Sequence, residues 1–199
     1  MARGPRSTSR DLALISMFAG VMAALGLVPA FTPPGLGVPI TAQSLGVMLA
    51  GSVLGARRGA LSMVLFLALV AAGLPLLAGG RGGLGVFTRE SVGFLLCFPV
   101  AAFVIGWLSA RVGPPYSLPW GVVSNIVGGI LVLYAGGILG GAAVLDVSVG
   151  AAFVASWVFL PGDIAKVVVA AFVARGVHAA YPGLLGRSRP AEPRDVAAV

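Results

Sequence analysis

The stretch "LPGDIAKVVVAAF", residues 160–172, decides the fold because it places two opposite charges at the start of an apolar segment. Asp163 and Lys166 are three residues apart, so a helix would put both side chains on one face. Pro161 suits the first turn of a helix and disrupts a helix interior. We therefore predict a helix that begins near Pro161 and ends by residues 175–178. Asp163 then lies in the first turn, where the helix dipole favours an acid.

The composition indicates a membrane protein. The chain has 199 residues, of which 58% are hydrophobic and 10% charged, and its mean hydropathy is +1.04. A soluble domain usually has about 25% charged residues, because its surface faces water. A net charge of +7 is compatible with nucleic-acid binding, but the basic residues are scattered between apolar runs, which is the membrane pattern. We therefore expect lipid contact and no nucleic-acid partner.

The residues available for chemistry are few. Cys97 is the only cysteine and His178 the only histidine, so the sequence offers no disulfide framework, no histidine-based triad and no metal cluster. No serine stands in a G-x-S-x-G context. We predict that the protein is not an enzyme and holds no metal.

Six apolar segments, separated by breaks rich in glycine or proline, predict a bundle of six transmembrane helices. They run over residues 11–31, 43–56, 59–77, 90–110, 119–141 and 161–178. The second is short for a bilayer core, which needs about 20 residues as helix. The apolar stretch 142–160 is predicted to be an outer-face connection, partly helical, that lies over the bundle.

The positions of the arginines predict that both termini are cytoplasmic. The first ten residues resemble the basic start of a signal peptide, but the apolar stretch that follows is long enough to span and is expected to be retained. With six spans, most of the thirteen basic residues fall on the cytoplasmic side, as the positive-inside rule expects. These are Arg3, Arg6, Arg10, Arg57, Arg58, Arg111, Arg175, Arg187, Arg189 and Arg194. The predicted organisation is a cytoplasmic tail at 1–10, the six-helix domain at 11–178 and a disordered cytoplasmic tail at 179–199.

Three basic residues are left unexplained by this topology. Arg81, Arg89 and Lys166 all map to the outer half of the protein. Charged groups at membrane depth usually face a protein interior or a wet cavity, and they mark functional sites by default. We therefore interpret Asp163 and Lys166 as part of a site. The alternative is a local ion pair whose lysine reaches outward to water.

Other polar or small residues give weaker signals. The loop "AGGRGGLG", residues 78–85, lacks the G-K-[ST] ending of a phosphate loop, which excludes that function. Its glycines can form a tight turn or allow the backbone to approach a ligand, and both interpretations stay open. Gln43 begins the second span just after Thr41, and together they offer donors and acceptors at the outer surface.

The first span carries small residues at helical spacing. Ala19 and Ala23 form a small-xxx-small pattern, with Gly20 and Ala24 offset by one residue. In lipid, such patterns let helices approach closely. The pattern serves either packing within this protein or docking of another membrane protein.

Three motifs in order resemble the BioY family, the biotin-specific substrate-capture subunits of energy-coupling-factor transporters. They are "PIT-Q" within "GVPITAQSLG" (37–46), "GLP-x-x-AGG-x-GG" (73–83) and "PGD-x-x-K" (161–166), and the resemblance covers roughly residues 11 to 175. It implies a substrate-capture fold in the bacterial cytoplasmic membrane, with biotin as ligand and no cofactor. It also implies a membrane coupling subunit and two cytoplasmic ATPases as partners, and allows a homo-oligomer. An ion- or proton-coupled carrier and a non-transporting scaffold are the alternatives.

The resemblance also implies a set of site residues. Asp163 and Lys166 match the acid–lysine pair of the last motif. Biotin has a ureido ring, which suits paired donors and acceptors, and a carboxylate, which suits a cation; Lys166 and Arg89 are both candidates for the carboxylate. The full expected ligand set is Gln43, Gly79, Gly80, Arg89, Phe94, Tyr134, Asp163 and Lys166, and Ala19 and Ala23 are the expected contacts of the coupling subunit.

The chain departs from the family pattern before the fourth span. Relatives often read Gly-Pro-Thr-x-Gly followed by Tyr or Phe, whereas this chain reads "TRESVGF" at 88–94. Glu90 can pair with Arg89 and compete with a carboxylate for that cation.

Overall fold

The protein is a bundle of helices in a computed structural model that describes residues 5–31, 38–113, 115–182 and 184. Secondary structure in these ranges is helical apart from two isolated bridges, Phe31 with Ile40 and Leu77 with Arg81. The helices are α1 (Pro5–Gly26), α2 (Gln43–Leu54), α3 (Ala56–Ala71), η1 (Leu84–Thr88), α4 (Val92–Arg111), α5 (Leu118–Ile126), η2 (Val127–Val132), α6 (Leu133–Leu145), α7 (Val149–Ser156), η3 (Trp157–Phe159) and α8 (Leu160–Ala180).

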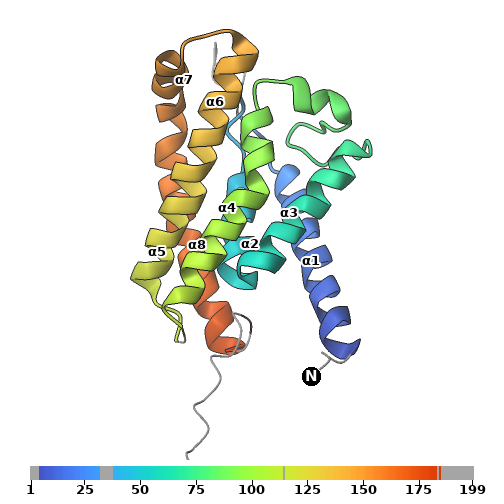
Figure 1. Cartoon of the computed structure of the whole chain (residues 1–199), viewed down its shortest axis with the longest axis vertical. Helices are drawn as coiled ribbons and strands as arrows, with labels where there is room; N and C mark the ends of the chain where they lie inside the picture. Colours follow the sequence, from blue (N-terminus) through green and yellow to red (C-terminus); the bar gives the residue numbers. More distant parts are fainter. Residues whose placement is uncertain (1–4, 32–37, 114, 183, 185–199) are drawn as a thin grey trace, which may run out of the picture.

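These elements make six passes through the bundle, as the sequence predicts. The fifth pass joins α5, η2 and α6, and the sixth joins α7, η3 and α8. In the described residues four helical stretches are long and apolar enough to cross a membrane: Thr8–Gly26, Val92–Arg111, Leu118–Leu145 and Val149–Ala180. Figure 1 shows that the start of α1 and the end of α8 lie at the same end of the bundle. An even number of passes follows from that arrangement.

The second and third passes are shorter than a full span. α2 has 12 residues and α3 has 16, which correspond to about 18 and 24 Å of helix, against about 30 Å for the hydrocarbon layer. Gly55 links the two helices with φ of 80°, a conformation that glycine adopts at no steric cost. Residues 38–42, which precede α2, are irregular. Irregular backbone within a bilayer is tolerated only where it is buried in protein or lines a cavity.

The last pass differs from its predicted boundaries. The prediction that residues 142–160 form a connection over the bundle is wrong: α6 continues to Leu145, and Ser148 caps α7 by accepting a hydrogen bond from Ala151 N. α7 then packs along α6. The predicted helix start near Pro161 is confirmed: α8 begins at Leu160, and the proline takes a first-turn position, where its missing N–H breaks no bond. The 3-10 turn η3 joins α7 to this helix, so the pass itself begins earlier.

The ends of the chain also differ from the expected boundaries. α1 begins at Pro5, so residues 5–10 of the expected tail are helical, and α8 extends to Ala180. Most of the expected C-terminal tail, residues 183 and 185–199, lies outside the described residues.

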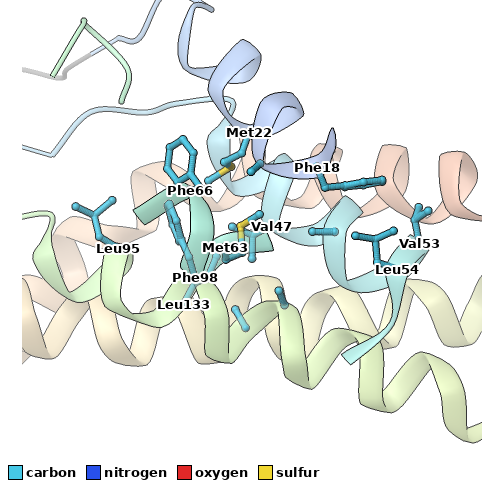
Figure 2. Packing of buried hydrophobic residues seen from close by; sticks show 14 of the residues in the cluster. Phe18, Met22, Val47, Val53, Leu54, Met63, Phe66, Leu95, Phe98 and Leu133 are labelled. Carbon is cyan, nitrogen blue, oxygen red and sulfur yellow. The ribbon is translucent and has the colours of Figure 1, made fainter. Parts of the chain in front are cut away.

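A core of large apolar side chains holds the first four passes together. Met22, Val47, Met63 and Phe66 are fully buried, and they come from α1, α2 and α3 (Figure 2). Gly46 of α2 lets α1 approach, since a Cβ there would lie 2.6 Å from the Met22 sulfur. In lipid this close packing, rather than removal of apolar surface from water, stabilises the contact between helices.

The small residues of α1 divide between two faces. Ala19 is 3% exposed and belongs to the core, and Ala23 is half-buried against it. Gly20 and Ala24 are exposed, and nothing described lies within 4 Å of where a Gly20 Cβ would be. Ala19 therefore packs within this protein. The small-xxx-small pair that is exposed on the surface of α1 is Gly20 and Ala24.

Candidate functional site

An ion pair between two neighbouring residues of α8 lies inside the bundle. Lys166 Nζ is 2.9 Å from Asp163 Oδ1, and the two side chains are 18% and 9% exposed. Lys166 does not extend outward to water, because its other bonds run to the start of α2. The interpretation as a solvent-seeking surface pair therefore does not describe this structure.

The Lys166 ammonium group has a partner for each of its three N–H donors. It donates to Thr41 O at 2.7 Å, to Ser44 Oγ at 2.9 Å and to Asp163 Oδ1. The Thr41 carbonyl belongs to the irregular chain before α2, where a backbone acceptor in lipid requires a partner. Lys166 thus fixes the start of α2 against α8.

Asp163 is equally well connected. Its Oδ1 also accepts from Ser44 Oγ at 3.0 Å, and its Oδ2 accepts from Tyr134 OH at 2.8 Å. The carboxylate therefore joins α2, α6 and α8. Ser44 was not among the residues predicted from the sequence. The available signal was its position directly after Gln43, as a polar residue at the start of the short second apolar segment.

This polar cluster forms one wall of a cavity whose remaining lining is mainly apolar. The cavity has a volume of about 80 Å³, several times the ~10–15 Å³ that one water requires. Its lining residues come from α2 and the chain before it, from the connection between α3 and α4, and from α4, α6, η3 and α8. They are Val38, Pro39, Ile40, Thr41, Gln43, Ser44, Leu77, Arg81, Ser91, Phe94, Leu95, Phe98, Leu133, Tyr134, Phe159, Asp163 and Lys166.

Phe94 forms an aromatic wall beside the ion pair. Its ring makes edge contacts with Tyr134 and Phe159, each at a centroid distance of 6.2 Å. Gly137 of α6 leaves the space for this ring, since a Cβ at that position would collide with Phe94. The cavity thus combines a flat apolar surface with a hydrogen-bonding end, the combination found in pockets for small molecules.

Gln43 contributes to the cavity wall, but its amide is engaged with the backbone. Nε2 donates to Leu76 O at 3.1 Å and to Met22 O at 3.4 Å, and Oε1 accepts from Ala78 N at 3.2 Å. The side chain is 3% exposed. Gln43 therefore joins the glycine loop to α1 and α2, and shapes the cavity by holding that loop.

The other predicted ligand residues line a neighbouring cavity of about 580 Å³. Gly79, Gly80 and Arg89 lie there together with Glu90. Gly79 and Gly80 have φ of 78° and 69°, so they make the tight turn that the sequence left as one of two interpretations. Pro39 and Arg81 border both cavities. The structure thus brings Gln43, Phe94, Tyr134, Asp163 and Lys166 to the main cavity and places Gly79, Gly80 and Arg89 beside it.

The fold and this cavity define a multi-pass membrane protein with a cavity suited to a small, partly polar ligand. In the described residues no group of three or more histidine, cysteine, aspartate or glutamate side chains is placed to hold a metal ion.

Comparison with known proteins identifies the family. Residues 2–183 match the BioY family, and the chain belongs to it. It is 47% identical to the biotin transporter BioY of Rhizobium etli, over 91% of this chain and 100% of that protein. It is 48% identical to the biotin transporter BioY of Rhodobacter capsulatus, over 88% of this chain and 97% of that protein.

The fold also matches a solved structure. The crystal structure of the S-component for biotin from an ECF-type ABC transporter superposes with a TM-score of 0.85. The match covers 89% of this chain and 95% of that one at 24% sequence identity, so it shows that the two chains share one fold.

Proposed function

We propose that this protein binds biotin in the main cavity and serves as the substrate-capture subunit of a biotin transporter. The observation that carries the proposal is the network of Asp163, Lys166, Ser44 and Tyr134 at one end of an apolar cavity. Family membership and the names of the two relatives support biotin as the ligand. The role is capture and transport, with no catalytic step.

The chemistry of biotin fits the two parts of the cavity. The ureido ring offers two N–H donors and a carbonyl acceptor in a compact uncharged group. Asp163 Oδ2 carries a single hydrogen bond in this structure, and a carboxylate oxygen has two acceptor positions, so it has room for a ureido N–H. The thioether ring and the aliphatic chain suit the side chains of Phe94, Leu95 and Phe159.

The transport step requires partners. We infer that the protein works in the bacterial cytoplasmic membrane with its termini inside. We further infer that a membrane coupling subunit and two ATPases drive release inward. The description of the structural neighbour as part of an ECF-type ABC transporter supports this arrangement. The exposed Gly20 and Ala24 of α1 offer a surface of small residues on which a partner helix can pack closely.

Titration of detergent-purified protein with biotin tests the proposal. We expect saturable binding that is lost in Asp163→Asn and Lys166→Ala, while Asp146→Asn, which changes an exposed acid at the end of α6, binds like the parent protein. Removing one partner of a buried ion pair destabilises a protein by several kcal/mol, so the thermal unfolding of each variant is measured in parallel. If the parent protein does not bind biotin, the alternative function of a non-transporting membrane scaffold would be favoured. Uptake that collapses with the proton gradient and requires no ATPase would instead indicate an ion-coupled carrier.

A further inference from the structure

A third cavity lies at the other end of α8 from the proposed biotin site. It has a volume of about 740 Å³, and it lies between the last turns of α8 and the chain that connects α4 to α5. Arg175 and His178 line it from α8, and Tyr116, Ser117 and Pro119 line it from the connection and the start of α5. Figure 1 shows the α4–α5 connection and the end of α8 at the end of the bundle where α1 begins. Among the described residues, this cavity and the main cavity share no lining residue.

The third cavity carries positive charge without an acid to balance it. Arg175 is exposed, and among the described residues it takes part in no ion pair and no hydrogen bond. None of the described residues that line the cavity is an aspartate or a glutamate. An anion can therefore approach the Arg175 guanidinium group, whose planar set of N–H donors suits phosphate oxygens, without a competing carboxylate in the cavity.

The start of α5 adds uncharged donors to the same cavity. Ser117 is the N-cap residue of α5, and its hydroxyl makes no capping hydrogen bond. Leu118, the first residue of the helix, also lines the cavity. The first N–H groups of a helix have no partner within the helix, and the positive end of the helix dipole favours an anion there. The Ser117 hydroxyl and the Leu118 N–H are therefore available to a phosphate that Arg175 attracts.

His178 and Tyr116 give the cavity a fixed wall. His178 Nε2 lies 2.9 Å from Ser52 O, and it donates to this carbonyl, which is one of the last four of α2 and has no partner within that helix. The Tyr116 ring stacks on the imidazole at a centroid distance of 5.1 Å. These contacts hold α8 against α2 and the α4–α5 connection against α8. The walls of the cavity are thus in place before a ligand arrives, which lowers the cost of binding.

Aromatic side chains mark this end of the bundle as the boundary of the lipid layer. Trp107 on α4 and Tyr181 at the end of α8 are exposed, and the Arg111 guanidinium carbon lies 3.6 Å from the centre of the Trp107 ring. Tryptophan and tyrosine are enriched where a span meets the lipid headgroups. The candidate spans that contain α4 and α8 end at Arg111 and Ala180. The cavity between these ends therefore lies at the depth of the lipid phosphates, on the cytoplasmic side in the proposed topology.

We propose that the third cavity binds the phosphate of an anionic phospholipid of the cytoplasmic leaflet. Arg175 and the donors at the start of α5 hold the phosphate, and an acyl chain follows the exposed apolar side of α8, where Phe172 lies one turn before Arg175. Basic pockets between transmembrane helices on the cytoplasmic side bind such headgroups. The bound lipid joins the end of α8 to the α4–α5 connection. This site is additional to the proposed function and does not depend on biotin.

The test compares short-chain phosphatidylglycerol, an anion, with phosphatidylcholine of the same chain length, which has no net charge. Affinities for both are measured by calorimetry with delipidated, detergent-purified parent protein, with Arg175→Gln and Arg175→Lys, and with the matched control Arg111→Gln. We expect the parent to prefer phosphatidylglycerol by about fivefold or more, which corresponds to about 1 kcal/mol for one basic residue near an anionic lipid. Arg175→Gln should remove this preference by weakening phosphatidylglycerol alone, whereas Arg175→Lys and Arg111→Gln should keep it. Thermal unfolding of each variant checks that it is folded.

Three outcomes would overturn the assignment. Equal affinity of the parent for the two lipids would show that lipid covers this end of the protein without a specific site. Loss of the preference in Arg111→Gln to the same extent as in Arg175→Gln would assign it to the overall charge of this end. Inorganic phosphate that binds as tightly as phosphatidylglycerol, and competes with it, would make the cavity a site for a soluble anion.

Discussion

Tyr134 of α6 donates a hydrogen bond of 2.8 Å to Asp163 Oδ2 of α8, and this bond joins the fifth and sixth passes at the cavity. It orients the carboxylate that also anchors Lys166 and Ser44. The carboxylate thus has a fixed direction before a ligand arrives, which lowers the cost of ordering it on binding.

Loss of the tyrosine hydroxyl should therefore weaken ligand binding without unfolding the protein. We expect Tyr134→Phe to reduce biotin affinity by about tenfold, since a hydrogen bond to a charged group is lost while the ring is kept. Isothermal titration calorimetry measures the change. Tyr181→Phe, at the exposed end of α8, is the control and should bind as the parent does. Equal affinity in both variants would remove the tyrosine hydroxyl from the site.

Gln43 should matter more for stability than for direct contact. Gln43→Ala leaves Ala78 N–H and two backbone carbonyls without their partner, and each unsatisfied buried group costs about 1–3 kcal/mol. We expect a lower midpoint of thermal unfolding together with weaker biotin binding. Thr88→Ala removes an exposed hydrogen bond close to the same loop and should leave the midpoint nearly unchanged. An unfolding midpoint in Gln43→Ala equal to that of the control would contradict the structural role.

Gly137 should control the width of the cavity. A methyl group at this position collides with the ring of Phe94, so Gly137→Ala should displace the ring and weaken biotin binding by tenfold or more. Gly150→Ala provides the comparison, because nothing described lies within 4 Å of the added carbon and alanine is the better helix former. Fluorescence or calorimetric titration compares the two. Normal affinity in Gly137→Ala would show that the ring can move without affecting the site.

The two faces of α1 predict opposite effects of a bulky residue. Ala19→Trp inserts a large side chain into the core and should destabilise the protein by about 1–3 kcal/mol or more. Gly20→Trp faces open space, so we expect normal folding and biotin binding but loss of biotin uptake in cells that contain the coupling subunit. Uptake and binding are measured on both variants. Normal uptake in Gly20→Trp would place the partner elsewhere.

The sequence predicted the number of passes, and it singled out Asp163 and Lys166 as two residues that face the protein interior, because both features leave strong local signals. Long apolar segments reveal spans, and the charges of Asp163 and Lys166 stand out in an apolar context. The short second segment was also predicted from the sequence, and the cavity lies beside the first residues of that helix.

What the sequence did not reveal depends on contacts between distant segments. The helix start near Pro161 was predicted, but the 3-10 turn η3 that joins α7 to this helix has no clear local pattern, so residues 149–159 were not assigned to the sixth pass. Ser44 looked like an ordinary helix residue until α8 placed Asp163 within 3.0 Å of it. Ala19 and Gly20 are adjacent small residues, and only the packing of α1 on α3 determines which of them is buried.

The short α2 has a consequence for the distance that a cargo travels. A helix of 12 residues covers about 18 Å, and the cavity lies at its first residues, below the level that a full-length span would reach. In the proposed transporter, a ligand held there would lie below the outer surface of the bilayer, and its inward step would be shorter than the bilayer is thick.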